Sequence, residues 1–485
     1  AALAFHRAAQ LLFDALELAP SDAAIDRARV RVELADALRN AGRGAEAAAI
    51  YEAAVADART SEEARRLRLL ATQTYLQSGR LDTGMRLAGE VLDAVGVRLS
   101  DSRNASLASM LYHRARLRFA RLELPTKPGR DDEVVRLDTV ATVGTVLSMV
   151  DFIRGAELQA RALRLALKAG AGERFVRALA TEAAVTGCTE EPPMRRGSAM
   201  LGRAEQEAEA SGDPYLRAFV ALSWASAELA QYRFRAAHDH AVFADGLLRE
   251  HCSGVPWELS TAHHLIGMTS WNLGLYRSLA ERAPRWVREA RERSDLYGTT
   301  TITTSSAFAI AIAEDHPEEG IDAVRAAMAE WAQPPFQIQH YFELKELSDL
   351  EIYSGRGADA HARHVRDWPA FRRSLLPTMP AMRFMMLAAR ARAALARARE
   401  DASAREALVA AAAKDLKDAR RALSQPVNVA MADQIDAEIH AARGDTERAK
   451  RTLVAAIAGL RANEMSGFAA AAALHRNRAA RNRRF

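Results

Sequence analysis

Small and large apolar residues recur at helical spacing along most of the chain. Between Leu34 and Ala58 they form two stripes, the first made of Leu34, Ala35 and Leu38 and the second of Ala47, Tyr51 and Ala54. Gly42 lies between the stripes, and glycine commonly ends a helix. The pattern therefore predicts two antiparallel helices joined by a short turn, with alanines where the backbones approach most closely.

The same order of small residues, glycine and large apolar residues returns six more times. The further copies span Ala71–Val91, Trp224–Ala244, Ile266–Ala283, Ala307–Ala327, Leu347–Ala360 and Ala437–Ala456. The second copy follows the first by 37 positions, and the copies at Ile266, Ala307 and Leu347 follow one another by 41 and 40 positions, which is a spacing typical of helical repeat arrays. One hairpin cannot bury its apolar flank alone, so the copies are expected to stack on one another.

The fold class that follows is all-α, because no run of useful length alternates apolar and polar residues as a strand does. A stretch with two prolines, a glycine and a cluster of charges at 124–134, and a second stretch with two prolines at 331–340, predict loops that divide the array. We expect N-terminal helical repeats over 1–124, central repeats over 134–330, C-terminal repeats over 341–474 and a basic tail over 475–485.

Composition fits closely packed helices and excludes several other classes. The chain has 485 residues and 53.0 kDa, which is too long for one ordinary core, and its aromatic content is only 6%. Its two cysteines, Cys188 and Cys252, exclude a disulfide framework and favour a reducing compartment, so a cytoplasmic location is expected. No apolar run approaches the ~20 residues of a membrane span, so no membrane contact is expected.

The net charge of +5 belongs to the C-terminus rather than to the whole chain. The last ten residues hold five arginines and no acid, so the remainder has a net charge of 5 − 5 = 0. A nucleic-acid-binding surface concentrates positive charge on one face, and a neutral body does not. The tail is expected to be a solvated helix end. No nucleic-acid binding is expected beyond weak contact through this tail.

The copies resemble the tetratricopeptide repeat, which has small residues at the helix crossing, glycine at the turn and an aromatic residue in the second helix. That resemblance implies a right-handed superhelical solenoid with a concave wall that binds a protein or peptide. The period exceeds the 34 residues of that family. HEAT-like helix pairs, and unrelated hairpins packed in one bundle, therefore stay open as alternatives.

In tetratricopeptide repeats, particular positions of the first helix line the concave wall. Carried over to three copies of this chain, they predict a partner-binding groove formed by Arg29, Asp36, Arg39, Asn40, His264, Met268, Trp271, Asn272, Phe342, Lys345, Asp349 and Tyr353. Trp, Tyr and Arg are enriched at binding hot spots, which suits protein recognition. Ordinary packing between repeats is the alternative for Trp271 and Phe342.

A resemblance to a narrower group of proteins comes from three segments, Thr145–Ala184, Gly357–Ala396 and Asp433–Leu460. They are similar to the C-terminal repeat region of large bacterial serine/threonine protein kinases of the myxobacterial and planctomycete kind. In those proteins a kinase domain and an AAA-type ATPase module precede the repeats. The resemblance covers roughly Ala1 to Leu474 and implies that a kinase domain lies upstream of Ala1.

Catalytic motifs are missing from the chain itself. It has no phosphate-cradling G-x-x-x-x-G-K-[ST] loop, and Ile153 follows Asp151 and Phe152 where the magnesium-binding triplet of a kinase needs glycine. His361 and His364 lie three positions apart without a third suitable ligand, which favours solvated helix histidines over a metal site. No catalytic residue, cofactor or metal is therefore expected.

The expected function is a non-catalytic interaction or scaffold module, forming the regulatory or sensory region of a kinase polypeptide. A parent protein that phosphorylates proteins through an upstream domain is the enzymatic alternative. A third possibility is the sensor domain of a large transcriptional regulator. The partner, the oligomeric state and any small-molecule signal do not follow from the sequence.

Overall fold

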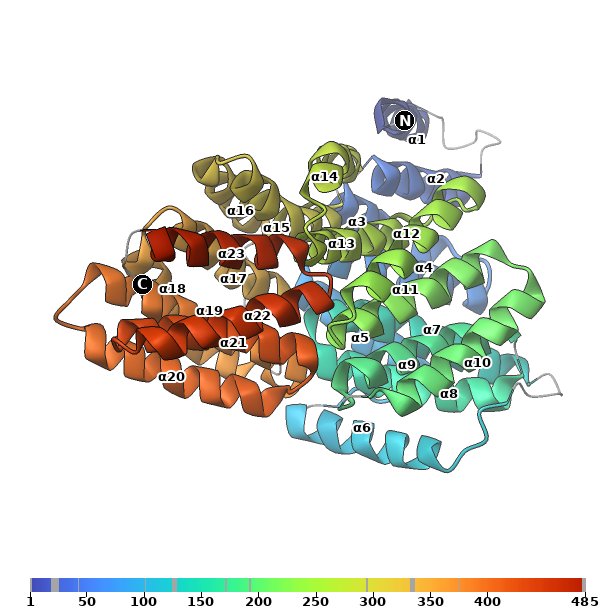
Figure 1. The fold of residues 1–485 in the computed structure, drawn as a ribbon. Helices are drawn as coiled ribbons and strands as arrows, with labels where there is room; N and C mark the ends of the chain where they lie inside the picture. Colours follow the sequence, from blue (N-terminus) through green and yellow to red (C-terminus); the bar gives the residue numbers. More distant parts are fainter. Residues whose placement is uncertain are drawn as a thin grey trace. The chain divides into compact units, whose positions relative to one another are not determined.

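The computed structural model describes residues 2–18, 26–41, 43–100, 102–123, 129–170, 172–191, 193–293, 295–331, 336–374 and 376–481. Over these ranges the chain forms 23 α-helices and two short 3-10 helices, at Val55–Asp57 and Leu376–Thr378, and no β-strand (Figure 1). The predicted all-α fold is confirmed. None of the helices in the described ranges has the length and apolar character needed to cross a bilayer.

The chain divides into two compact units. Unit 1 comprises Ala1–Glu182 and Arg285–Thr299, and unit 2 comprises Ala183–Pro284 and Thr300–Phe485. These boundaries differ from those of the three repeat segments expected from the sequence, which stay a prediction.

Unit 1 consists of eight complete helices and parts of three others. The complete ones are α1 (Ala2–Leu18), α2 (Arg27–Asn40), α3 (Gly44–Ala54), α4 (Ser61–Gln77), α5 (Leu81–Ala94), α6 (Arg103–Arg118), α7 (Asp131–Val150) and α8 (Phe152–Ala169). Helices α9 (Gly172–Thr189), α14 (Tyr276–Glu292) and α15 (Leu296–Ala313) each contribute residues to both units.

The first predicted hairpin forms the centre of an alanine-rich core in unit 1. Helices α2 and α3 pack on each other, and α3 packs on α4. Ala35, Ala47 and Tyr51 are fully buried between them, as the stripe pattern predicts. Alanines allow this close packing because they occupy little space between two backbones. Helix α6 lies outside the series and packs along α8.

Unit 2 contains the remaining helices. They are α10 (Arg195–Ser211), α11 (Pro214–Ala230), α12 (Phe234–His251), α13 (Pro256–Leu273), α16 (Pro317–Trp331), α17 (Ile338–Tyr353), α18 (Gly357–Arg373), α19 (Pro380–Glu400), α20 (Arg405–Ala422), α21 (Pro426–Ala442), α22 (Thr446–Ala462) and α23 (Ser466–Arg481). Helix α19 packs on α20, and α21 packs on α22, so each pair is a hairpin.

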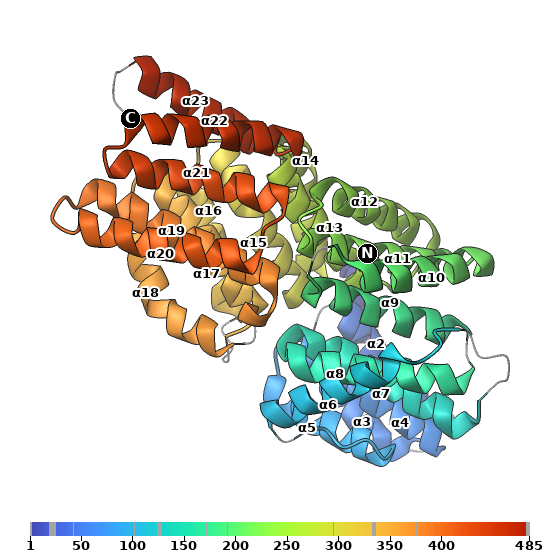
Figure 2. The ribbon, with the colours of Figure 1, turned by 60° about the horizontal axis from the view of Figure 1, so that its bottom comes forward.

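The first helices of neighbouring hairpins contact one another in unit 2. Helix α11 packs on α13, α17 on α19, and α19 on α21, and the last two pairs also lie side by side in Figure 2. The final helix, α23, packs on both α22 and α13. Near this junction the Ser466 hydroxyl donates a hydrogen bond to the carbonyl oxygen of Leu273 at 2.8 Å. Unit 2 is thus closed by a contact between its last helix and a much earlier one.

Each of the seven predicted copies lies on two successive helices, and in six of them described residues form a short turn between the two. At four of these turns the expected glycine adopts a left-handed backbone conformation, with φ between 74° and 83° at Gly79, Gly274, Gly355 and Gly444. Glycine ends a helix this way because it has no Cβ to clash with the backbone. Gly42 lies outside the described residues, as do 482–485 of the predicted basic tail, whose earlier residues continue α23 to Arg481.

Candidate functional site

The four groove residues predicted in the first copy all lie on α2, in unit 1. Arg29 is exposed and pairs with Glu33 at 2.8 Å. Asp36 accepts a hydrogen bond from the hydroxyl of Tyr51, which is buried on α3.

The remaining two residues lie near the end of the same helix. Arg39 pairs with Asp36 at 3.3 Å, and its guanidinium carbon lies 5.9 Å from the centroid of the Tyr51 ring. Asn40 is half-buried as the last residue of α2. Asp36 and Arg39 therefore contact each other and Tyr51 at the crossing of α2 and α3.

The second set, on α13 in unit 2, packs against neighbouring helices. The Nδ1 atom of His264 lies 3.3 Å from the carbonyl oxygen of Thr301 on α15. Trp271 is half-buried, and its ring contacts those of Tyr276, Phe308 and Phe468 at centroid distances of 4.9 to 5.5 Å.

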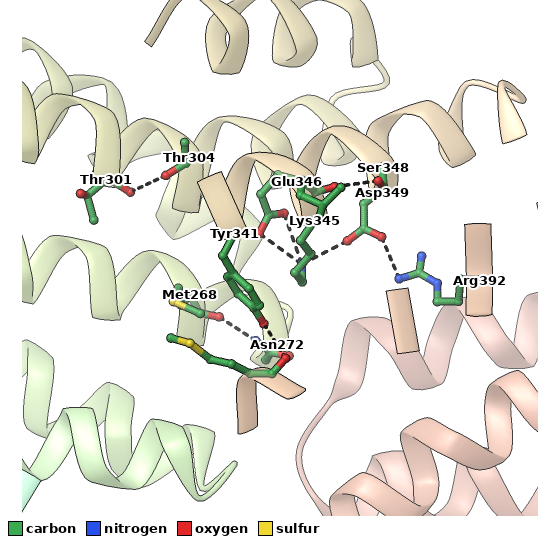
Figure 3. A network of polar contacts seen from close by, with 12 residues as sticks. Met268, Asn272, Thr301, Thr304, Tyr341, Lys345, Glu346, Ser348, Asp349 and Arg392 are labelled. Carbon is green, nitrogen blue, oxygen red and sulfur yellow. Dashed lines mark hydrogen bonds and ion pairs between the residues drawn. The ribbon is translucent and has the colours of Figure 1, made fainter. Parts of the chain in front are cut away.

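The two other predicted residues of α13, Met268 and Asn272, also contact residues within unit 2. Met268 is half-buried and packs on the apolar cluster around Tyr341 and Phe342. Asn272 is buried, and its side-chain amide donates to the carbonyl oxygen of Met268 at 2.8 Å (Figure 3).

The third set, on α17, is mostly buried. Phe342 belongs to the apolar core, and Lys345 and Asp349 are buried charges. The Lys345 ammonium lies 3.1 Å from Asp349, and Arg392 of α19 reaches the same carboxylate at 2.8 Å (Figure 3). Tyr353 alone is exposed, and its hydroxyl donates to Asp315 at 2.7 Å.

The α13 and α17 sets meet inside unit 2. The rings of His264 and Phe342 pack edge to face with centroids 5.0 Å apart. Phe308 of α15 lies between the two sets, since its ring contacts Trp271 and also lies 5.0 Å from the Lys345 ammonium. The predicted residues of these two copies are thus neighbours, but most of their side chains are occupied by contacts within the unit.

The buried charges on α17 form a network in which burial and neighbouring charges shift the pKa values of the two carboxylates in opposite directions. Burial raises the pKa of Glu346 to about 8, although the neighbouring Lys345 opposes the shift. Burial disfavours charge on Lys345 as well, yet the two carboxylates of Glu346 and Asp349 raise its pKa. The pKa of Asp349 is lowered because Arg392 and Lys345 outweigh the effect of its burial. Lys345 and Asp349 therefore form a charged pair at neutral pH.

Two histidines in unit 2 are held in the neutral form. Burial lowers the pKa of His264 to about 4. Burial and the charge of Arg390 lower the pKa of His364 to about 3. The expectation of a solvated His364 is wrong, because α18 packs between α17 and α19 and leaves this ring fully buried. Among the described residues, no three His, Cys, Asp or Glu side chains are placed to hold a metal ion.

A pocket of about 570 Å³ lies at the C-terminal end of unit 2. Its walls come from α19, α21 and α23, together with single residues of α20 and α22. The lining is mainly apolar, with Leu395, Ala398, Ala437, Ala441, Ala442, Leu453, Ala471 and Ala472. The polar lining residues are Arg399, Arg405, Gln434 and Glu438. Arg399 and Arg405 are exposed, so the pocket opens at the surface.

The repeat pattern contains a signal for this pocket. In the copy whose turn contains Gly355, predicted groove residues precede the glycine by ten, six and two positions, at Lys345, Asp349 and Tyr353. Applied to the copy whose turn contains Gly444, the same three offsets give Gln434, Glu438 and Ala442, and all three line the pocket.

The groove residues predicted from the sequence come from three other copies, so this pocket is not among the predicted sites. No protein-family model and no curated protein matches this chain, so any function assigned to it has to come from the geometry of its own residues.

Proposed function

We propose that the chain is a non-catalytic interaction module that binds a protein segment along the first helices of its hairpins. In this proposal the hairpins stack as a tetratricopeptide-like solenoid with a right-handed superhelix. The contacts between first helices in unit 2, α17 with α19 and α19 with α21, support this arrangement. A wall built from first helices is where such arrays receive an extended or helical peptide.

The observation that carries the proposal is the pocket between α19, α21 and α23. Its floor of alanine and leucine accepts apolar side chains, because it offers them contact area with few polar groups to desolvate. Its rim is charged: Arg399 pairs with Glu438 at 3.1 Å, and Arg405 donates to the carbonyl oxygen of Ala398 at 3.2 Å. Two arginines against one glutamate leave an excess of positive charge. The favoured ligand is therefore an apolar segment with a carboxylate side chain beside it.

The wider assignment rests on the resemblance to kinase repeat regions. It places this module in the regulatory or sensory part of a serine/threonine kinase polypeptide in the cytoplasm. A kinase domain encoded upstream of Ala1 would support that assignment, whereas a DNA-binding helix-turn-helix in the same polypeptide would favour the transcriptional-regulator alternative. The reading frame that contains this chain distinguishes them.

Peptide display tests the pocket directly. A random peptide library is selected on the wild-type chain, and the enriched peptides are then measured against two variants. Ala471→Trp places a large ring at the pocket, whereas Ala458→Trp places the same ring on an exposed position of α22 outside it. We expect binding to be lost with the first variant and kept with the second. Peptides that bind all three proteins equally, or a selection that enriches none, would contradict the proposal.

A further inference from the structure

Helix α6 differs from the paired helices of unit 1. It packs along α8, while α7 and α8 form a hairpin of their own. Figure 1 shows α6 along the edge of unit 1. An added helix in this position leaves one long side without a partner among the described residues of its unit.

The inward face of α6 is narrow. Ser106, Met110 and Leu117 are buried, and they recur at the four- and seven-residue spacing that aligns side chains along one side of a helix. These three residues pack α6 against α8, so the other large apolar residues of the helix are not part of this contact.

The outward face nevertheless carries large apolar side chains. Leu107 is 37% exposed, Leu111 57%, Tyr112 55%, and Phe119, directly after the helix, 87%. Single exposed apolar residues are ordinary, but three on one helix and a fourth directly after it mark an interaction surface.

Positive charge flanks this row. Between Ser102 and Leu122 the sequence has five arginines and no acidic residue. Arg114 pairs with Glu182 at 2.8 Å, but Arg116, Arg118 and Arg121 are exposed and have no ion-pair partner in the part of the chain that the structure describes. Helix α6 and the residues directly after it thus combine an exposed apolar face with arginines that have no ion-pair partner among the described residues.

Helix α8 adds a further cation beside Tyr112. The guanidinium carbon of Arg164 lies 5.6 Å from the centroid of the Tyr112 ring, and its Nη1 atom lies 2.7 Å from Nδ1 of His113. Tyrosine and arginine each combine an apolar body with a polar tip, which suits a position between a charged layer and an apolar one.

We propose that the outward face of α6 binds the surface of an anionic lipid bilayer. Leu107, Leu111 and Phe119 enter the boundary between headgroups and acyl chains, while the arginines contact the lipid phosphates. A single outer helix presents a ridge, which a flat bilayer accepts along its length. A peptide helix, by contrast, usually binds in a groove between two helices. The sequence predicted no membrane contact because no apolar run is long enough to span a bilayer. A helix that lies in the plane of the membrane surface does not need such a run.

Vesicle flotation with the full chain tests this inference, which is independent of the pocket in unit 2. We expect binding to vesicles of phosphatidylglycerol mixed with phosphatidylcholine, weaker at higher salt, and little binding to pure phosphatidylcholine. Leu111→Glu combined with Phe119→Glu should weaken binding at least about tenfold. Neutralising Arg116, Arg118 and Arg121 with glutamine should weaken it roughly a hundredfold, since each basic residue near an anionic surface contributes about a fivefold factor.

Val365→Glu provides the matched control, because Val365 is 62% exposed on α18 and belongs to unit 2. It should leave vesicle binding unchanged, and all variants should keep the wild-type helical content. The lipid assignment is overturned if the wild type ignores the anionic vesicles at low salt, or if the α6 variants bind like the wild type. It is also overturned if the wild type ignores vesicles but binds an acidic amphipathic peptide through Leu111, because the face would then belong to a protein partner.

Discussion

The ring of Trp271 packs edge-on against the ring of Phe468, with 5.5 Å between their centroids. Trp271 lies on α13 and Phe468 on the last helix, α23, so this contact joins two distant parts of the chain within unit 2. The side chain expected to anchor a partner therefore already contacts a helix of the same chain. A partner that used Trp271 would have to displace α23.

The contribution of this contact to stability can be measured with a double-mutant cycle. Trp271→Ala and Phe468→Ala should each lower the free energy of unfolding of unit 2 by about 2 kcal/mol, less than for a fully buried aromatic residue because Trp271 is half-buried. The double variant should lose clearly less than the sum, since an aromatic pair contributes about 0.5–1.5 kcal/mol beyond its buried area. Urea unfolding of the four proteins gives the coupling energy. Strict additivity would show that α23 does not rest on α13 in solution.

Breaking the buried charge network should be costly. Asp349→Ala removes the carboxylate that lies near both Lys345 and Arg392 and leaves Lys345 with Glu346 alone, whose pKa is already raised by burial. We expect a loss of about 3 kcal/mol, the usual effect of removing one partner from a buried ion pair. Asp418→Ala is the control, because its pair with Arg421 lies at the surface and should contribute less than about 1 kcal/mol. Similar losses for the two variants would contradict a buried network.

The sequence pattern predicts the helices well because it reports where apolar side chains recur. The expected glycine turns at Gly79, Gly274, Gly355 and Gly444 have the left-handed conformation that a helix end requires. The alanines at the crossing of α2 and α3 are buried as expected. Both features depend on neighbouring residues, so local sequence is enough to find them.

Long-range contacts are not predictable in the same way. Lys345 and Asp349 lie four positions apart on α17, which is also the spacing of an ordinary solvated ion pair, so the sequence gives no sign that both are buried. The packing of α23 on α13 and the position of α6 on α8 depend on how hairpins are arranged in space. The pattern therefore gives the position of each candidate groove residue along its helix. It does not give the exposure of that residue, because exposure depends on which other helices pack against the helix.

The stability of unit 2 should fall as pH rises toward 8. Because the folded-state pKa of Glu346 is raised to about 8 from an ordinary value of 4.5, the folded chain holds a proton that the unfolded chain releases. The resulting stabilisation of the folded state is fully present below pH 4.5 and is lost as pH rises to about 8. His264 and His364, whose pKa values are lowered, affect stability only below the ordinary value of 6.5.

Glu346→Gln should remove this dependence. Between pH 6.5 and 8 the wild type should lose on the order of 1 kcal/mol relative to the variant. Urea unfolding of both proteins at several pH values in this range measures the difference. Parallel stability curves would mean that Glu346 reaches solvent or is ionised throughout.

Two glycines in helices of unit 1 should respond to alanine with opposite signs. At Gly155, a Cβ would lie 2.5 Å from the Cα atom of Ser148, where α7 and α8 cross, and a backbone atom cannot move aside as a flexible side chain can. Gly155→Ala should therefore destabilise unit 1 by about 1–3 kcal/mol through overpacking. At Gly89 in α5, a Cβ meets nothing within 4 Å, so Gly89→Ala should stabilise the helix by about 0.5–1 kcal/mol. The shift of the urea midpoint at an unchanged slope measures both, and a stabilising Gly155→Ala would show that α7 and α8 do not approach this closely.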